Sequence, residues 1–232
     1  MRIGLLGGTF NPIHNCHLQI ALEIQERFPL DQVLFIPSGI PPHKVEADIP
    51  SGAHRLEMTR LAVVPYPRFK VSDIEVGRSG PSYSVDTLRA LLPKLEGEAF
   101  FILGVDAFLE IETWKEPEHL LTLCHFIVVS RPEHPFSSLR QIPLIDPDDT
   151  TLLKKIDAGE IDRLTLIPSS IPGAKSLTFF KVHPCLMSAT DVRKRLREGT
   201  SLKNFLPEAV RSYIMKNNLY AREKKRGETP KR

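Results

Sequence analysis

The sequence predicts a single α/β domain with a doubly wound, mostly parallel sheet of the Rossmann-like type and a small helical C-terminal part. The length of 232 residues suits one such domain. Hydrophobic residues make up 41% and charged residues 25%, which is typical of a folded globular chain. Short apolar segments with strand-like residues alternate with amphipathic segments. No repeat or linker divides the chain, so we expect one domain over residues 1–221 and a separate tail over 222–232.

Seven segments are predicted to be strands because each carries β-branched or aromatic residues and ends in Gly, Pro, Ser or Asp. They are residues 2–6, 33–37, 69–72, 99–103, 125–130, 164–167 and 177–183. Helices are expected at 15–27, 52–64, 84–95, 116–124, 190–198 and 207–217. In the first helix one stripe is apolar; it comprises Leu18, Ala21, Leu22 and Ile24. Segments 38–51 and 131–149 are rich in proline, and we expect active-site or mobile surface loops there.

The net charge of +3 comes from the tail. Residues 222–232 hold six Lys or Arg and two Asp or Glu, which leaves a net charge of −1 for the rest. We expect a solvated tail and no nucleic-acid partner, with contact to RNA or acidic lipid as the alternative. The longest apolar runs are too short to cross a membrane, and glycines and a proline interrupt the N-terminal run, so neither a membrane span nor a secretory signal is expected.

The chain has three cysteines, Cys16, Cys124 and Cys185, at wide and unpatterned spacing. Such spacing predicts neither a disulfide framework nor a zinc site, so we expect a reduced, soluble, cytoplasmic protein. A metal site made by Cys16 with His14 and His17 is the alternative, but three ligands within four residues suit tetrahedral geometry poorly.

The strongest motif is GGTFNPIHNCH, which links the first strand to the first helix. Gly7 and Gly8 allow a sharp turn and a close approach of ligand to backbone N–H groups. The helix that follows offers unpaired N–H groups to an anion. His14 and His17 lie three residues apart and are expected to point the same way, toward a phosphate chain. The alternative is that the two histidines cap and pack the helix.

Other nucleotide-binding patterns are absent from the sequence. It contains no G-x-G-x-x-G at the first turn and no G-x-x-x-x-G-K-[ST] anywhere, which disfavours a dehydrogenase or a P-loop ATPase. The segment MSATDVRKRL instead predicts a second phosphate site. Ser188 and Thr190 are good helix N-caps, and Arg193 follows within the same helix. Taken alone, this segment could be an ordinary capped helix.

Four further segments carry candidate residues, each with a plainer structural alternative. Lys44 follows two prolines in a loop and could neutralise a phosphate. The segment SGPSYSVDTL reads as a helix start. Asp106 follows a predicted strand, where an acid commonly accepts hydrogen bonds from ribose hydroxyls. Trp114 could be a core residue, and Arg131 could be an ordinary loop arginine.

Together these motifs resemble the HxGH nucleotidyltransferases, whose signature is GGTFDPxHxGH. From residue 1 to about residue 220 the chain is most similar to the family of bacterial nicotinate-nucleotide adenylyltransferases. The resemblance implies adenylyl transfer from ATP to nicotinate mononucleotide, giving deamido-NAD and pyrophosphate in NAD biosynthesis. It implies Mg²⁺ held mainly by the phosphates of ATP and by water.

The resemblance also assigns residues of this sequence to roles. Catalytic groups would be His14, His17, Lys44 and Arg193. ATP would contact Gly7, Gly8, Thr9, Phe10, Gly104, Asp106, Arg131, Ser188 and Thr190. Nicotinate mononucleotide would contact Ser82, Tyr83, Ser84, Thr87 and Trp114.

Three residues depart from the family pattern: Asn11 replaces Asp, Cys16 replaces Gly, and Glu133 replaces Gly. Asn11 lacks the charge with which the family's Asp could orient other groups, and Cys16 adds a side chain where Gly allows the ligand close to the backbone. Glu133 puts the shape of its loop in question. The alternatives are a related nucleotidyltransferase with a phosphopantetheine, polyol phosphate or nicotinamide mononucleotide acceptor, a non-catalytic nucleotide-binding protein, or an RNA-binding protein acting through the tail. The sequence leaves a homo-oligomer open.

Overall fold

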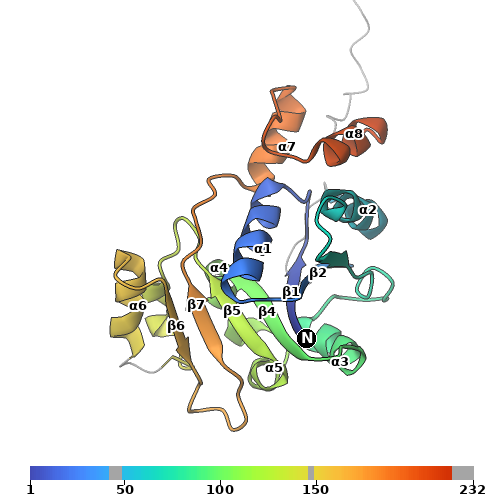
Figure 1. The fold of residues 1–232 in the computed structure, drawn as a ribbon. Coiled ribbons are helices and arrows are strands. Elements are labelled where there is room, and N and C mark those ends of the chain that lie inside the picture. The colour runs from blue at the N-terminus through green and yellow to red at the C-terminus, as the bar shows by residue number, and fades with distance from the viewer. Residues whose placement is uncertain (42–48, 146–148, 221–232) are drawn as a thin grey trace, which may run out of the picture.

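The fold is built on a seven-stranded sheet, seen in a computed structural model that describes residues 1–41, 49–145 and 149–220. The strands lie in the order β3-β2-β1-β4-β5-β7-β6 (Figure 1). Every neighbouring pair is parallel except β6 and β7, which are antiparallel. The strands are β1 (Arg2–Gly8), β2 (Gln32–Pro37), β3 (Phe69–Val71), β4 (Glu98–Gly104), β5 (His125–Val129), β6 (Arg163–Leu166) and β7 (Leu177–Phe180).

Helices connect the strands and cover both faces of the sheet. The α-helices are α1 (Asn15–Arg27), α2 (Gly52–Val63), α3 (Ser84–Leu91), α4 (Val105–Phe108), α5 (Pro117–Leu123), α6 (Asp149–Ala158), α7 (Ala189–Glu198) and α8 (Glu208–Lys216). Three short 3₁₀ helices are η1 (Leu92–Lys94), η2 (Ile111–Thr113) and η3 (Phe136–Gln141). Within the described ranges no helix is long and apolar enough to cross a membrane.

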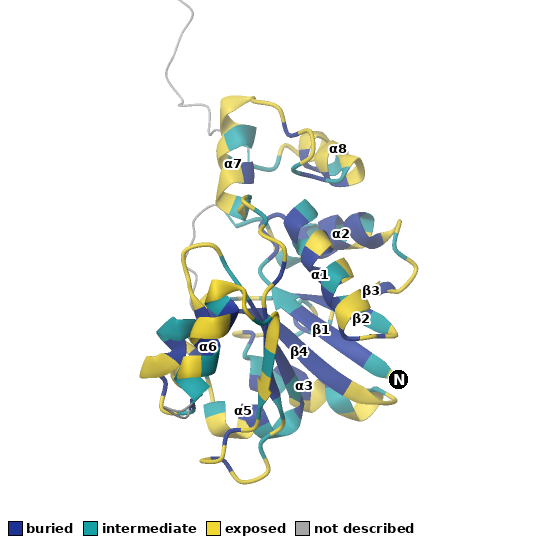
Figure 2. Ribbon diagram, turned by 60° about the vertical axis from the view of Figure 1, so that its left-hand side comes forward, coloured by how far each residue is buried: buried dark blue, intermediate teal, exposed yellow. Residues whose placement is uncertain are grey.

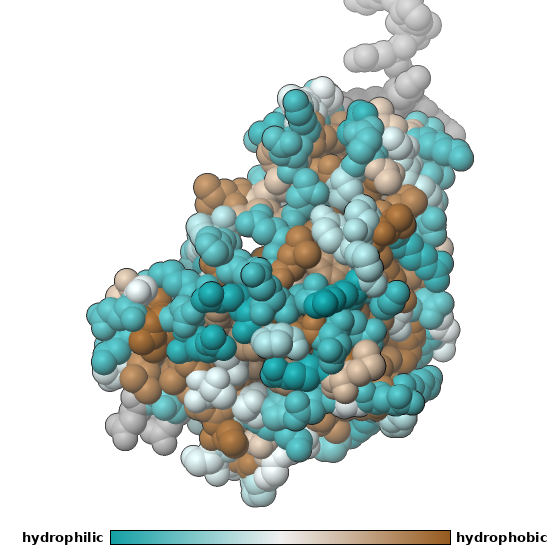
Figure 3. All heavy atoms as spheres, viewed as in Figure 1, coloured by the Kyte–Doolittle hydropathy of each residue, from teal (hydrophilic) through white to brown (hydrophobic). Residues whose placement is uncertain are grey.

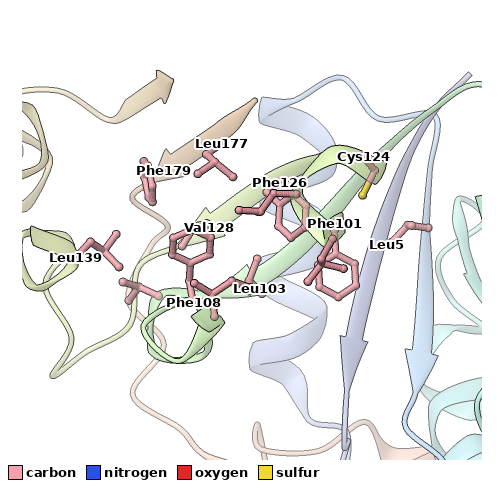
Figure 4. Packing of buried hydrophobic residues seen from close by; sticks show 14 of the residues in the cluster. Leu5, Phe101, Leu103, Phe108, Cys124, Phe126, Val128, Leu139, Leu177 and Phe179 are labelled. Carbon is pink, nitrogen blue, oxygen red and sulfur yellow. The ribbon is translucent and has the colours of Figure 1, made fainter. Parts of the chain in front are cut away.

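The sheet separates two hydrophobic cores. Buried side chains of α1, α2, α7 and α8 pack on one face, and those of α3, α4, α5, η3 and α6 pack on the other. The central strands are buried along most of their length, as expected of parallel strands covered on both faces (Figure 2). In the second core, aromatic side chains such as Phe101, Phe126 and Phe179 interdigitate (Figure 4).

All seven predicted strands and all six predicted helices are present, and the doubly wound, mostly parallel sheet is confirmed. The helix expected at 84–95 ends at Leu91, and a 3₁₀ turn containing Pro93 follows it, because proline has no N–H to donate. On α1 the buried stripe includes Ile20, whereas Leu22 is 40% exposed. The tail at 222–232 lies outside the described residues.

The segment 131–149, which was expected to be a loop, is a loop only in part, because it contains η3 and because α6 begins at its last residue, Asp149. These two elements stabilise each other. The carboxylate of Asp157 on α6 accepts hydrogen bonds from the backbone N–H groups of Phe136 and Ser137, at 2.8 and 2.9 Å. Since the partner lies about twenty residues away in sequence, the local composition of the loop did not reveal the structure.

The cysteines correct another expectation. Cys16, on α1, and Cys185, between β7 and α7, are joined by a disulfide across a sequence separation of 169 residues. The expectation that all three cysteines are reduced was therefore wrong. Spacing along the chain could not reveal this pair, because only the folded sheet brings the start of α1 beside the segment that leaves β7. Cys124 is free and buried.

Candidate active site

A cleft of about 970 Å³ opens at the carboxyl ends of β1, β4 and β5. Its position matches the topology. The chain moves outward from β1 to β2 and β3, and then returns to place β4 on the other side of β1. Parallel sheets bind ligands at such a switch point, because the loops diverge there and leave a crevice. In the view of Figure 3 the surface is largely hydrophilic, with small apolar patches between the polar side chains.

Most of the residues predicted from the sequence line this cleft. They are Gly7, Gly8, Thr9, Phe10, His14, His17, Ser82, Ser84, Gly104, Asp106, Trp114, Arg131, Ser188, Thr190 and Arg193. Tyr83 and Thr87 are not among the lining residues. Lys44 lies outside the described residues, so its place relative to the cleft stays a prediction.

The turn after β1 is made differently from the prediction. Gly7 and Gly8 belong to the strand, and neither has a positive φ. The reversal occurs at Phe10, whose φ is +46°. Packing keeps Phe10 in this conformation. Its side chain is 3% exposed and lies edge-on to the ring of His17, with the ring centroids 5.1 Å apart. A side chain at Gly8 would meet the Phe10 ring at about 3.0 Å, so glycine there gives the ring its space.

His14 and His17 lie against each other at the start of α1. Their ring centroids are 3.8 Å apart, and the backbone N–H of His14 donates to Nδ1 of His17 at 3.2 Å. Burial, reinforced by the charge of Arg131, lowers the pKa of His14 to about 4. His14 is therefore a neutral imidazole at pH 7. A neutral ring can still donate one hydrogen bond to a ligand oxygen.

Helix α7 supplies the opposite wall of the cleft. Its first turn has a capping box, in which Ser188 Oγ accepts from Asp191 N at 3.1 Å and Ser188 N donates to the Asp191 carboxylate at 2.9 Å. The Ser188 hydroxyl also donates to Asp191 Oδ2 at 2.6 Å, and this hydrogen bond, together with that from Ser188 N, lowers the pKa of Asp191. Arg193 donates to Thr190 Oγ1 at 3.3 Å and to the carbonyl of Asn11 at 2.9 Å.

The contact between Arg193 and Asn11 joins segments 182 residues apart in sequence. The predicted convergence of residues 7–17 with residues 188–193 is therefore confirmed, and both segments line the same cleft. Figure 1 shows α7 above the start of α1. Asn11 has a second long-range partner, because the Tyr220 hydroxyl donates to its side-chain Oδ1 at 2.9 Å.

Asp106 and Arg131 face each other at the ends of β4 and β5. Asp106 Oδ1 lies 3.5 Å from Arg131 Nε. Both side chains lie directly over Gly104, and a Cβ atom there would clash with each of them. Glycine at the end of β4 thus leaves room for the Asp106 carboxylate and the Arg131 guanidinium to lie side by side at the cleft wall.

The segment expected to bind a pyridine nucleotide divides into two layers. Ser82 and Ser84 line the cleft, and Ser82 Oγ also accepts from the backbone N–H of Gly39 at 2.9 Å. Thr87 is buried behind them, where it donates to Glu75 Oε1 at 2.7 Å. Burial raises the pKa of Glu75. Thr87 therefore supports the cleft wall through Glu75. Tyr83 also lies outside the cleft lining, where its ring centroid is 5.2 Å from Lys115 Nζ.

Sequence reasoning missed Arg55, the largest side chain that is almost fully buried. Its guanidinium donates to the carbonyls of Thr9 and Gly39, each at 2.7 Å, and to that of Pro50 at 3.1 Å. It thereby ties the turn after β1 to both ends of the proline-rich segment. The available signal was an arginine in register with Thr59 and Ala62 on the buried face of α2, where a charge is rare unless it is paired.

Comparisons with known proteins agree with this geometry. Residues 5–195 match the family model described as cytidylyltransferase-like. The chain is 40% identical over 220 residues to a "probable nicotinate-nucleotide adenylyltransferase" of Desulfatibacillum aliphaticivorans, covering 95% of this chain and 100% of the relative. A protein of the same name from Citrifermentans bemidjiense is 41% identical over 229 residues, covering 95% and 98%.

Solved structures share the fold at low sequence identity. The Plasmodium falciparum nicotinic acid mononucleotide adenylyltransferase in complex with NaAD superposes with a TM-score of 0.67 and 18% identity, covering 94% of this chain and 97% of that one. The same protein in complex with APC gives a TM-score of 0.62. At this identity the likeness shows that the fold is shared.

Proposed function

The chain belongs to the cytidylyltransferase-like family and, within it, to the nicotinate-nucleotide adenylyltransferases, and from this we propose that it transfers the adenylyl group of ATP to nicotinate mononucleotide. The products are deamido-NAD and pyrophosphate, which places the enzyme in NAD biosynthesis. The observation that carries the proposal for this chain is the convergence on one cleft of the two segments that the sequence predicts to bind phosphate. ATP as substrate supports a cytoplasmic location.

In this reaction a phosphate oxygen of the mononucleotide attacks the α-phosphorus of ATP in line, and the bond to the pyrophosphate oxygen breaks. No protein nucleophile is required, so catalysis depends on positioning the two substrates and stabilising charge on the phosphate oxygens. His14 and His17 at the start of α1 would donate to oxygens of the triphosphate. Arg193 and Lys44 would neutralise the β- and γ-phosphates as pyrophosphate leaves.

The remaining cleft residues would place the nucleosides. The backbone of Gly7, Gly8, Thr9 and Phe10 and the α7 residues Ser188 and Thr190 would contact ATP. Asp106 at the end of β4 would accept from ribose hydroxyls, with Gly104 and Arg131 beside it. Trp114 would stack on the pyridine ring, with Ser82 and Ser84 near its carboxylate and with Tyr83 and Thr87 supporting that wall.

Magnesium fits this site as part of the substrate. Within the described ranges, no three His, Cys, Asp or Glu side chains are arranged to hold a metal ion. Asp106, the carboxylate at the end of β4, is paired with Arg131, and Asp191 is engaged in the α7 capping box. Mg²⁺ would therefore be bound by phosphate oxygens and water, and it would neutralise the triphosphate.

An acceptor panel tests the proposal. The pure protein would be supplied with Mg-ATP and, separately, nicotinate mononucleotide, nicotinamide mononucleotide or phosphopantetheine, and with CTP and a polyol phosphate. Pyrophosphate release and product mass would be measured. We expect the highest kcat/KM and a deamido-NAD product with nicotinate mononucleotide. Preferential turnover of another acceptor would assign the chain to a different transferase, and no turnover with any acceptor would make it a nucleotide-binding protein.

A matched pair of histidine variants links that turnover to the cleft. We expect His17→Ala to lower kcat by roughly 10²–10³-fold, as does removal of one donor to the developing charge in other enzymes. His119 lies exposed on α5 and does not line the cleft, so His119→Ala should keep kcat within twofold. Near-normal turnover of a folded His17→Ala variant would remove that residue from the mechanism.

A further inference from the structure

The disulfide between Cys16 and Cys185 lies at the wall of the cleft and connects its two phosphate-binding segments. Cys16 is the second residue of α1 and stands between His14 and His17. Cys185 lines the cleft three residues before Ser188, the N-cap of α7. The two Cα atoms are 5.8 Å apart, a separation that disulfides ordinarily span. The folded backbone itself therefore brings the pair into bonding range.

The two sulfurs differ in how a small molecule could reach them. Cys16 is 2% exposed and counts among the buried residues of α1. Cys185 is half-buried and belongs to the cleft lining. A small thiol or disulfide entering the cleft would therefore react at Cys185 first. Cys16 would act second, as the resolving or leaving sulfur.

Around Cys185 the polar ties to α1 lie at the protein surface, while Val182 and Met187 on either side of it pack in the same hydrophobic core as α1. The backbone N–H of His183 donates to the Glu23 carboxylate at 3.0 and 3.2 Å, and its ring Nδ1 lies 2.8 Å from Glu23 Oε1. The His183 side chain is 82% exposed, so water competes for these contacts. Beyond residue 185, Arg193 on α7 donates across the cleft to the carbonyl of Asn11. The disulfide is thus the covalent part of a connection whose polar contact at His183 is exposed to water.

We propose that Cys16 and Cys185 form a reversible thiol–disulfide pair that sets the affinity of the triphosphate site, with a low-molecular-weight disulfide such as glutathione disulfide as oxidant. In the oxidising direction the Cys185 thiolate attacks one sulfur of the small disulfide and releases one small thiolate. The Cys16 thiolate then attacks Cys185 Sγ of the mixed disulfide and releases the second. Two protein thiols lose two protons and two electrons, and one small disulfide becomes two thiols.

The effect on binding follows from chain entropy. With the bond closed, residues 183–188 are held beside the first turn of α1 before ATP arrives. With the bond open, that segment gains freedom that ATP binding must remove, so the affinity falls. Neither sulfur is assigned to the reacting atoms. We therefore expect reduction to raise the KM for ATP about fivefold or more and to change kcat less than twofold.

Thiol counting tests the pair without any assay of turnover. The full-length protein would be equilibrated with glutathione and glutathione disulfide at several ratios, quenched, denatured, alkylated and weighed. We expect one alkylated cysteine under oxidising conditions and three under reducing conditions. Cys124 is buried in the core (Figure 4), and burial raises the pKa of its thiol to about 12, so it should stay reduced in the folded protein at every glutathione ratio. It should therefore be the one cysteine that is alkylated after denaturation under all conditions.

Variants separate the pair from its surroundings. Cys185→Ser should lose the change in thiol count and should bind ATP like the reduced protein at every glutathione ratio. Cys124→Ala is the matched control and should keep the full redox response. If Cys16→Ser folds, it should behave like Cys185→Ser. Three reactive thiols at all ratios, a stable glutathione adduct on Cys185 without ring closure, or equal ATP affinity in both redox forms would each overturn the proposal.

The KM measurement rests on the proposed function, whereas thiol counting and calorimetric titration with a non-hydrolysable ATP analogue do not. Failure to transfer adenylyl groups, with an intact redox shift in analogue affinity, would overturn the proposed function and leave the cysteine pair standing. Normal adenylyl transfer with no redox shift in analogue affinity would support the proposed function and overturn the proposal for the cysteine pair.

Discussion

At the scale of single residues, the site combines a buried neutral histidine with groups fixed by the backbone. His14 is 4% exposed and lies next to His17 and within the field of Arg131. Its low pKa keeps it uncharged until a ligand arrives. An anionic triphosphate in the cleft would oppose both causes of that shift, because it supplies negative charge and hydrogen-bond acceptors.

The pKa of His14 predicts how stability depends on pH. Between about pH 6.5 and 4 the unfolded state binds a proton at this position that the folded state does not, so falling pH favours unfolding. From pH 7 to 5 we expect this term to lower the free energy of unfolding by about 2 kcal/mol. Denaturant unfolding at several pH values should show the free energy of unfolding falling less steeply with falling pH in His14→Asn than in the wild type.

The control for this measurement is His119→Asn, because His119 is exposed on α5. As the pH falls, its free energy of unfolding should decrease in parallel with that of the wild type. If His14→Asn also runs parallel to the wild type, His14 is charged in the folded protein and the account of the histidine pair is contradicted.

Trp114 gives a second prediction at this scale. It lines the cleft and is the one tryptophan of the chain. We expect Trp114→Ala to raise the KM for nicotinate mononucleotide about tenfold or more, because an aromatic stacking partner is lost, while the KM for ATP changes less than twofold. Trp114→Phe should restore most of the affinity. Equal loss for both substrates would remove Trp114 from the acceptor pocket.

At the scale of elements, the cleft depends on loops that a buried arginine holds together. Arg55 on α2 fixes the turn after β1 and both ends of the segment around residues 39–50 through three backbone carbonyls. The expected loop at 38–51 is therefore anchored at its stems. The sequence indicated the helix but not this role, because the three acceptors are backbone atoms that no side-chain motif marks.

Replacing Arg55 tests that anchoring. We expect Arg55→Met to lower the free energy of unfolding by about 3 kcal/mol, since three partly buried carbonyls lose their donors at a cost of about 1 kcal/mol each. It should also raise the KM for ATP. Arg60→Met on the same helix replaces a half-exposed arginine and should change stability by less than about 0.5 kcal/mol. Similar results for the two variants would contradict the anchoring role.

Elements were easier to predict from the sequence than their contacts. Each strand and helix expected from apolar periodicity is present, because burial on a sheet imposes that periodicity. The elements that were not expected include α4, η2, η3 and α6. Of these, η3 and α6 stabilise each other through Asp157, a contact between residues distant in sequence. The turn after β1 was located correctly, but its reversal at Phe10 depends on core packing rather than on glycine, and its role in phosphate binding stays a prediction.

At the scale of the whole molecule, strand order determines which motifs meet. Because β1 and β4 are neighbours at the switch point, the segments that follow them face one cleft, and α7 closes it from the far end of the sequence. Motif chemistry indicated that residues 7–17 and 188–193 share a ligand. The Cys16–Cys185 pair uses the same convergence but has no recognisable motif, so only the fold reveals it.

The basic tail provides a prediction at this scale. Deleting residues 222–232 should leave kcat/KM for adenylyl transfer within twofold, since every cleft residue named above precedes it. Neither the full chain nor the deletion should bind RNA at physiological salt, which an electrophoretic mobility shift would check. RNA binding that disappears with the tail would instead support the RNA-binding alternative.

The measurement closest to the central claim compares ATP with AMP as ligands of Arg193→Ala. If residues 7–17 and 188–193 grip one triphosphate, calorimetry should show ATP binding weakened about tenfold or more, since Arg193 would contact only the β- and γ-phosphates. AMP binding should change less than twofold, and the exposed Lys194→Ala on the same helix should alter neither. Equal losses for ATP and AMP, or no loss of ATP affinity, would contradict the account.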